Sequence, residues 1–172
     1  VAYKHLKGAF PHLMIGGPAV VGVNPAWEKM FFDRLKEENI KLDFFSWHTY
    51  SHDPLIFREC AREIRRLLDE NGFSGTQSIC NEWNYVKDWG ETFTQSIETV
   101  ISMKGAAYTA ACMCVGMDSD IDMLMYYNAA PSIYNGLFDF YTLKRLKGYY
   151  PFKMFNELYM LGNHVHLSME EE

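Results

Sequence analysis

Four short stretches of mainly apolar residues are spaced along the chain. They cover residues 12–19, 42–50, 77–83 and 121–127. Apolar residues run almost continuously through each stretch instead of alternating with polar ones, which is typical of strands that are covered on both faces. We therefore predict four buried strands, the first of which closes at Gly16-Gly17.

Helical patterns lie between these stretches. The dipeptides Asn24-Pro25 and Asp53-Pro54 are typical helix starts, because the first residue caps the helix and proline suits the first helical position. The second helix should continue to about residue 70 and end at Asn71-Gly72. Apolar residues recur at helical spacing in both segments, at Trp27, Met30, Phe31 and Leu35 and at Ile56, Cys60, Ile64, Leu67 and Leu68.

Three further helices are expected in the second half of the chain. Residues 91–103 and 106–115 have helical patterns, and we expect Gly105 to separate them. The last helix should run over residues 151–161, and the tail that ends at Glu172 should be frayed.

The alternation of strands and helices predicts an α/β fold with a parallel sheet that is buried by helices on its outer side. The units recur every roughly 35 to 40 residues, close to the roughly 30 residues per unit of an eight-unit (β/α)8 TIM barrel. We interpret residues 1–172 as half of such a barrel, with an open flavodoxin-like sheet as the alternative on pattern alone.

Composition and charge narrow the range of functions. The net charge of −6 and the sequence pI near 5.5 disfavour binding to nucleic acid, which requires a basic surface. No apolar run approaches the roughly 18 residues of a membrane-spanning helix, and no leader pattern opens the chain. Because the first residue is Val1, we expect further sequence upstream.

The cysteines do not indicate a metal site. Cys60, Cys80, Cys112 and Cys114 have no CxxC spacing and no metal-like spacing with histidines. Cys112 and Cys114 should point to different faces of a helix, so a disulfide between them is not expected. We interpret all four as reduced core residues, which slightly favours the cytoplasm over a secreted location.

The residues at the strand ends are the candidates for chemistry, because active sites of barrels lie at the carboxyl ends of the strands. These ends carry Gly16-Gly17, then His48 and Tyr50, then Asn81, Glu82, Trp83 and Asn84, and finally Tyr126, Tyr127 and Asn128. Glu82 is the strongest candidate, since a carboxylate directly after an apolar strand is costly to bury unless it is paired or functional. A glutamate that caps a helix or lies on the surface is the alternative.

The other strand-end side chains also have structural explanations. His48 is as well explained by a hydrogen bond to the backbone as by a substrate contact. Trp47 and Trp83 are more typical of core packing than of sugar binding. Tyr126 and Tyr127 must point to opposite faces if both lie in a strand.

Three motifs together resemble the second half of clan A glycoside hydrolases, most closely family 39, which contains β-xylosidases and α-L-iduronidases. HLMIGGPA is similar to the fifth strand of that family, LDFFSWHTY to the sixth, and ICNEWNY to the seventh, in this order along the chain. The resemblance implies a retaining glycosidase that acts on xylo-oligosaccharides or another small β-glycoside, with no metal or organic cofactor. Glu82 would be the nucleophile, and the sugar would be bound by His48, Tyr50, Asn81, Trp83 and Tyr127.

The sequence departs from the family in two respects. Tyr127 stands where the family has a tryptophan at the end of the eighth strand. The general acid/base, a glutamate in an Asn-Glu pair after the fourth strand, has no counterpart, since Asn156-Glu157 falls inside the last predicted helix and is best explained as solvated. Because retaining hydrolysis requires two carboxylates, we expect the chain alone to be inactive.

A half barrel would expose strand edges and an apolar inner face. We therefore expect a partner, either the missing N-terminal half or a second copy of the chain. The other hypotheses are a non-catalytic carbohydrate-binding or self-associating protein, and an unrelated α/β domain in which Glu82 only caps a helix.

Overall fold

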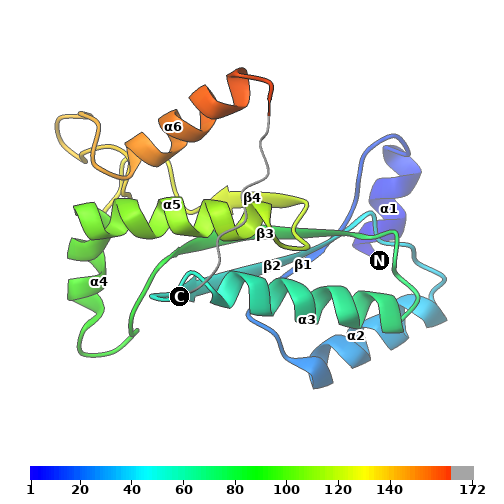
Figure 1. The fold of residues 1–172 in the computed structure, drawn as a ribbon. Helices are drawn as coiled ribbons and strands as arrows, with labels where there is room; N and C mark the ends of the chain where they lie inside the picture. The colour runs from blue at the N-terminus through cyan, green and yellow to red at the C-terminus, as the bar shows by residue number, and fades with distance from the viewer. Residues whose placement is uncertain (164–172) are drawn as a thin grey trace, which may run out of the picture.

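A sheet of four parallel strands in the order β1-β2-β3-β4 forms the centre of the computed structural model, which describes residues 1–163 (Figure 1). The strands are β1 (Gly17–Val21), β2 (Phe44–Ser51), β3 (Gln77–Tyr85) and β4 (Met123–Tyr126). The helices are α1 (Ala2–Ala9), α2 (Pro25–Glu37), α3 (Ile56–Glu70), α4 (Phe93–Val100), α5 (Met103–Met117) and α6 (Tyr149–Met160). This arrangement confirms the predicted α/β class, with parallel strands and a helix between each consecutive pair.

The hydrophobic core lies between the sheet and the helices that connect its strands. Helices α2 and α3 run along one side of the sheet, and α5 lies beside them (Figure 1). Phe32 of α2 packs against Phe45 of β2 with ring centroids 5.6 Å apart, and Phe57 of α3 meets Trp83 of β3 at 5.3 Å. All four rings are buried, so this side of the sheet is closed.

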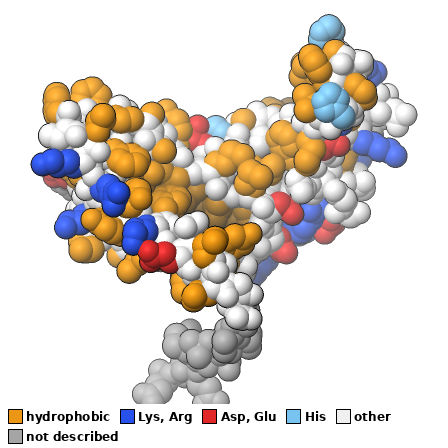
Figure 2. All heavy atoms as spheres, turned by 90° about the horizontal axis from the view of Figure 1, so that it is seen from above, with side chains coloured by type: hydrophobic (Ala, Val, Ile, Leu, Met, Phe, Trp, Pro, Cys, Tyr) orange, Lys and Arg blue, Asp and Glu red, His pale blue; other side chains and the backbone are white. Residues whose placement is uncertain are grey.

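The face of the sheet turned away from α2 and α3 is open. Hydrophobic side chains gather there between two raised ends of the molecule (Figure 2). Val21 of β1 and Met123 and Met125 of β4 are among the exposed apolar residues. Within residues 1–163 the sheet is therefore covered on one side only.

The start of α2 was predicted correctly, but α3 begins at Ile56, after the predicted start at Asp53-Pro54 and without a side-chain cap, and the buried faces are shifted. The side chain of Asn24 accepts a hydrogen bond from the main-chain N–H of Trp27, so Asn24 caps α2 as expected. Trp27 and Met30 are nevertheless exposed. The helix buries Leu35 as predicted, together with Glu28 and Phe32, which were not predicted. In α3 the buried residues are Phe57, Ala61, Ile64, Leu67 and Leu68, so Ile56 and Cys60 lie at the edge of the stripe.

The first strand begins later than predicted, which changes the place of the glycines. Residues 12–16 lie outside β1, and Gly17 pairs with Phe45, the second residue of β2. Gly16 and Gly17 therefore lie at the amino ends of the strands and not at their carboxyl ends, so their assignment to the functional edge is wrong. A Cβ atom on Gly16 would lie 2.1 Å from the carbonyl oxygen of Phe44, which explains the glycine by close packing.

The break between α4 and α5 falls before Gly105. The hydroxyl of Ser102 caps α5 by accepting from the N–H groups of Lys104 and Gly105. Gly105 therefore lies in the first turn of α5, where a Cβ atom would meet the carbonyl oxygen of Thr99 at 2.3 Å. The expected role of Gly105 as a separator is wrong, and its small size instead lets the end of α4 approach α5.

Several smaller points complete the fold. Helix α1 has no counterpart among the predicted helices, and the tail of residues 164–172, predicted to be frayed, lies outside the described residues. The four cysteines carry free thiols, as predicted, but only Cys80 and Cys112 are buried; Cys114 is exposed, so its expected place in the core is wrong. Up to residue 163, no single helix is long and apolar enough to cross a membrane; α4 and α5 pass that test only as a pair, bent by 79°.

Candidate functional site

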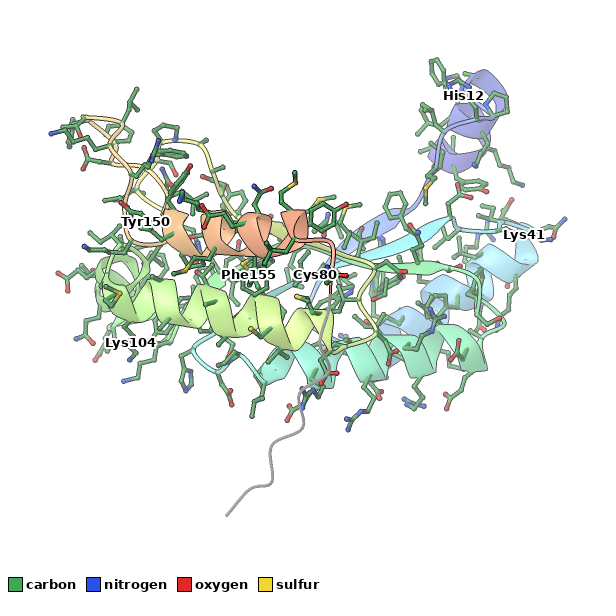
Figure 3. All side chains as sticks on the ribbon, turned by 45° about the horizontal axis from the view of Figure 1, so that its top comes forward. His12, Lys41, Cys80, Lys104, Tyr150 and Phe155 are labelled. Atoms are coloured by element: carbon green, nitrogen blue, oxygen red, sulfur yellow. The ribbon has the colours of Figure 1, made fainter. Side chains whose placement is uncertain are left out.

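The carboxyl ends of the strands lie at one end of the molecule. Lys41, which precedes β2, and His12 mark the opposite end, whereas Lys104 and Tyr150 lie near the carboxyl ends (Figure 3). His48, Tyr50, Glu82 and Tyr127 all belong to this carboxyl edge, as expected for strand-end residues.

A bulge in β3 decides which way Glu82 faces. Trp47 of β2 pairs with Cys80, but the next residue, His48, pairs with Glu82, so Asn81 is an extra residue in β3. Cys80 belongs to the buried core on the helix side, and in a regular strand a residue two positions later would face the same side. The extra residue reverses this alternation and turns Glu82 to the open face, while Trp83 returns to the core.

Two side chains from β2 approach the carboxylate of Glu82. The hydroxyl of Tyr50 donates a hydrogen bond to Oε1, and Nδ1 of His48 lies 3.6 Å from Oε2. Burial, followed by the hydrogen bond to Glu82, raises the pKa of Tyr50 well above its ordinary value. Tyr50 therefore keeps its proton and acts as a fixed donor to a carboxylate that is itself only 28% exposed.

Aromatic rings surround this group on the open face. Tyr50 meets Trp89 edge-on at 5.1 Å and Tyr134 at 5.9 Å, measured between ring centroids. Phe93 is stacked on Trp89 at 5.4 Å and on Tyr134 at 6.3 Å, and Tyr127 lies 6.2 Å from Tyr134. We call Tyr50, Trp89, Phe93, Tyr127 and Tyr134 the aromatic cluster.

Three members of the aromatic cluster were not predicted. Trp89, Phe93 and Tyr134 lie in or directly after the connections that follow β3 and β4. Burial raises the pKa of Tyr134, and the nearby groups of Tyr126 and Glu82 raise it further. None of the three is a strand-end residue, but each is an aromatic residue no more than eight positions after a strand end, and this is the signal in the sequence that could have identified them.

The two tyrosines at the end of β4 face opposite sides, as predicted. Tyr126 is packed against Trp83 at 5.2 Å and Phe152 at 5.3 Å, on the helix side. Tyr127 is exposed on the side of the aromatic cluster. The side-chain amide of Asn84 donates to the carbonyl oxygen of Tyr127 at 2.6 Å and so joins the ends of β3 and β4.

The remaining candidates differ in their placement. Trp83 is only 1% exposed and packs against Phe57 on the face opposite Glu82, so the expected sugar contact of Trp83 is not supported by its position. Asn81 is the bulged residue, and its Oδ1 is buried without a hydrogen-bond partner among the described residues. Trp47 is a core residue, whose indole N–H donates to the hydroxyl of Ser78 at 3.0 Å.

The second Asn-Glu pair, Asn156-Glu157, lies in a helix and does not resemble the setting of Glu82. Glu157 is an exposed residue of α6 that forms an ion pair with Lys153 at 2.6 Å, as expected for a solvated helix position. Among residues 1–163, no group of three or more His, Cys, Asp and Glu side chains is arranged to hold a metal ion.

Comparison with known proteins shows which structures the fold is similar to. No protein-family model and no curated protein matches the sequence. A glucosidase from Croceicoccus marinus is similar in structure with a TM-score of 0.62 and 30% identity, over 73% of this chain and 26% of that one. A GH39 β-xylosidase from Caulobacter crescentus matches with a TM-score of 0.64 and 21% identity, over 90% of this chain and 35% of that one.

A GH39 enzyme from Xanthomonas axonopodis pv. citri matches with a TM-score of 0.67 and 17% identity, over 91% of this chain and 35% of that one. The chain thus spans between about a quarter and about a third of the length of these three proteins. The four parallel strands and their helices are therefore similar in fold to part of the TIM barrel of glycoside hydrolases, family 39 enzymes among them.

Proposed function

We propose that this chain is part of a retaining glycoside hydrolase in which Glu82 is the nucleophile. The observation that carries the proposal is the setting of Glu82, a partly buried carboxylate at the carboxyl end of a parallel strand with Tyr50 donating to it and His48 beside it. A fixed donor on one oxygen orients the carboxylate, which is what a nucleophile requires. The similarity in fold to glycoside hydrolases supports the same reading.

The reaction would proceed in two steps. A carboxylate oxygen of Glu82 attacks the anomeric carbon, the bond to the leaving oxygen breaks, and that oxygen takes a proton from a second carboxylic acid. Water then attacks the anomeric carbon and gives a proton to the second carboxylate, which releases Glu82 and retains the configuration. His48 and Tyr127 would contact the sugar from either side.

The second carboxylate is proposed to come from the preceding half of the barrel. Retaining enzymes hold the two carboxyl groups about 5 to 5.5 Å apart. Glu82 cannot both attack the anomeric carbon and protonate the leaving oxygen in the same step. The chain by itself is therefore expected to be inert.

The same missing half is proposed to cover the open face of the sheet. Val21, Met123 and Met125 are exposed there, and exposed apolar faces of this kind favour association. The chain matches only about a third of each similar family 39 structure, which leaves room for four further strands. If the chain alone forms a dimer, and this dimer dissociates when the preceding half is supplied, the result would support the proposal that this half covers the open face.

Xylosides and glucosides are the first substrates to test, since the similar structures include β-xylosidases and a glucosidase. We would assay a panel of aryl β-glycosides with the chain alone and with the chain extended upstream through the preceding half, each with and without Glu82→Gln. The matched control is Glu157→Gln, an exposed carboxylate of α6. Activity of the extended protein that is lost with Glu82→Gln and kept with Glu157→Gln is the expected result.

A second candidate function is carbohydrate binding without hydrolysis. The exposed rings of Trp89 and Tyr127 favour it, because stacking on a sugar needs no second carboxylate. An extended protein that binds oligosaccharides but hydrolyses none of the panel would support this candidate and overturn the first.

A further inference from the structure

The indole of Trp89 lies in the loop after β3, at the carboxyl edge of the sheet, where it is held in place and yet remains exposed. Phe93 is stacked on one side of it with an interplanar angle of 17°, and Tyr50 meets it edge-on at 75°. Despite these contacts, 63% of the residue is exposed. A large apolar ring kept in a fixed position at the surface is typical of a binding site.

The loop that carries Trp89 is fixed by hydrogen bonds of its own. One carboxylate oxygen of Asp88 accepts from the N–H of Gly90 at 2.9 Å. The other accepts from the N–H and the hydroxyl of Thr92 at 2.9 and 2.8 Å. These bonds close the turn around Trp89, so the indole would lose little freedom when a ligand binds.

The position of Trp89 relative to Glu82 indicates which part of a substrate it meets. The ring of Tyr50 lies between them, since its hydroxyl donates to Glu82 and its ring contacts Trp89. A single side chain, that of Tyr50, therefore links the position of a sugar whose anomeric carbon is at Glu82 to the indole. The indole is in reach of the next ring along the substrate.

We propose that Trp89 is a specificity-determining platform for the ring linked to the sugar that Glu82 attacks. The proposal rests on the proposed function and adds a substrate class to it, namely glycosides with at least two linked rings. The apolar face of a pyranose or an aryl group would stack on the exposed indole, as rings do in ligand sites that are lined by aromatic side chains.

Trp27 provides a matched control. It is also partly exposed, and it is stacked on a phenylalanine, Phe31, at 5.2 Å with an interplanar angle of 14°. It lies on α2, however, on the other side of the sheet from Glu82. Truncation of Trp27 removes a similar ring without touching the site.

The test uses the chain extended through the preceding half of the barrel and compares Trp89→Ala, Trp89→Phe and Trp27→Ala. For the β-linked trisaccharide that is cleaved fastest, Trp89→Ala should raise KM roughly three- to tenfold with kcat nearly unchanged. Trp89→Phe should restore most of the affinity, and Trp27→Ala should have no effect. A KM that changes equally little in all three variants would overturn the platform while Glu82-dependent hydrolysis still stands.

A binding measurement separates failure of the platform from failure of the proposed function. Calorimetry with xylotriose and cellotriose is carried out on Glu82→Gln protein, with and without Trp89→Ala. A loss of binding with Trp89→Ala supports the platform even where hydrolysis is weak. Hydrolysis that is unaffected by Glu82→Gln would overturn the proposed function and, with it, the assignment of the neighbouring ring.

Discussion

Removal of one hydroxyl group, in Tyr50→Phe, tests the setting of Glu82 directly. The variant keeps the ring, its edge contact with Trp89 and its contact with Tyr134, and removes only the donor to the carboxylate. A hydrogen bond to a charged group contributes about 1.5 to 3 kcal/mol, and the lower half of that range applies to a carboxylate that is partly exposed. Since about 1.4 kcal/mol corresponds to a factor of ten, kcat/KM should fall roughly ten- to fiftyfold.

The assay is steady-state hydrolysis of an aryl β-glycoside by the extended protein over its range of pH stability. Because the pKa of Tyr50 is raised well above its ordinary value, the hydroxyl stays protonated and the loss should be the same at neutral and mildly alkaline pH. Tyr141→Phe, which changes an exposed tyrosine, is the control. An unchanged kcat/KM, or a loss confined to one limb of the pH profile, would refute the role of Tyr50 as a fixed donor.

Three further predictions concern the fold and need only this chain. Toward a thiol reagent, exposed Cys114 should react first, whereas buried Cys80 and Cys112 should react only on unfolding; rapid labelling of either would contradict the packing of the core. Burial raises the pKa of the Cys112 thiol from 9.0 to about 12. The neutral thiol should therefore contribute fully to stability below pH 9, and this contribution should be lost as the pH rises toward 12. In urea unfolding across this range, the free energy of unfolding should fall less for Cys112→Ala than for the unchanged chain. Gly105→Ala should lower Tm by the equivalent of about 1 to 3 kcal/mol because its Cβ would meet the end of α4, whereas Gly8→Ala, with open space around it, should raise Tm slightly.

The sequence predicts those parts of the fold that local chemistry decides. The cap at Asn24 and the stop at Asn71-Gly72 are visible in the sequence, because the side chain that accepts and the backbone that turns belong to neighbouring residues. The buried face of α2 is not visible in this way. Met30 is apolar but exposed, and Glu28 is polar but buried, since the sheet and α3 decide which side of the helix is covered.

The candidate site shows the same division. His48, Tyr50 and Glu82 are identified as strand-end residues and by resemblance, and the structure brings the three together. The bulge at Asn81 is not predictable from the period of the strand, because it depends on the pairing of β3 with β2. Trp83, next to Glu82 in the sequence, lies on the opposite face because neighbouring residues of a strand alternate, and the bulge decides that Trp83 is the one on the helix side.

One explanation accounts both for the open face and for the need of Glu82 for a second carboxyl group. A parallel sheet is stable when both of its faces are covered, and here the helices in the described part of the chain cover only one of them. Retaining hydrolysis likewise needs a carboxyl group opposite Glu82, about 5 to 5.5 Å away across that same open face. If one segment supplies both, the surface that completes the core also completes the catalytic pair, so association and activity should appear together. A preceding half that binds the open face tightly without making Glu82 necessary for hydrolysis would separate the two and refute this explanation.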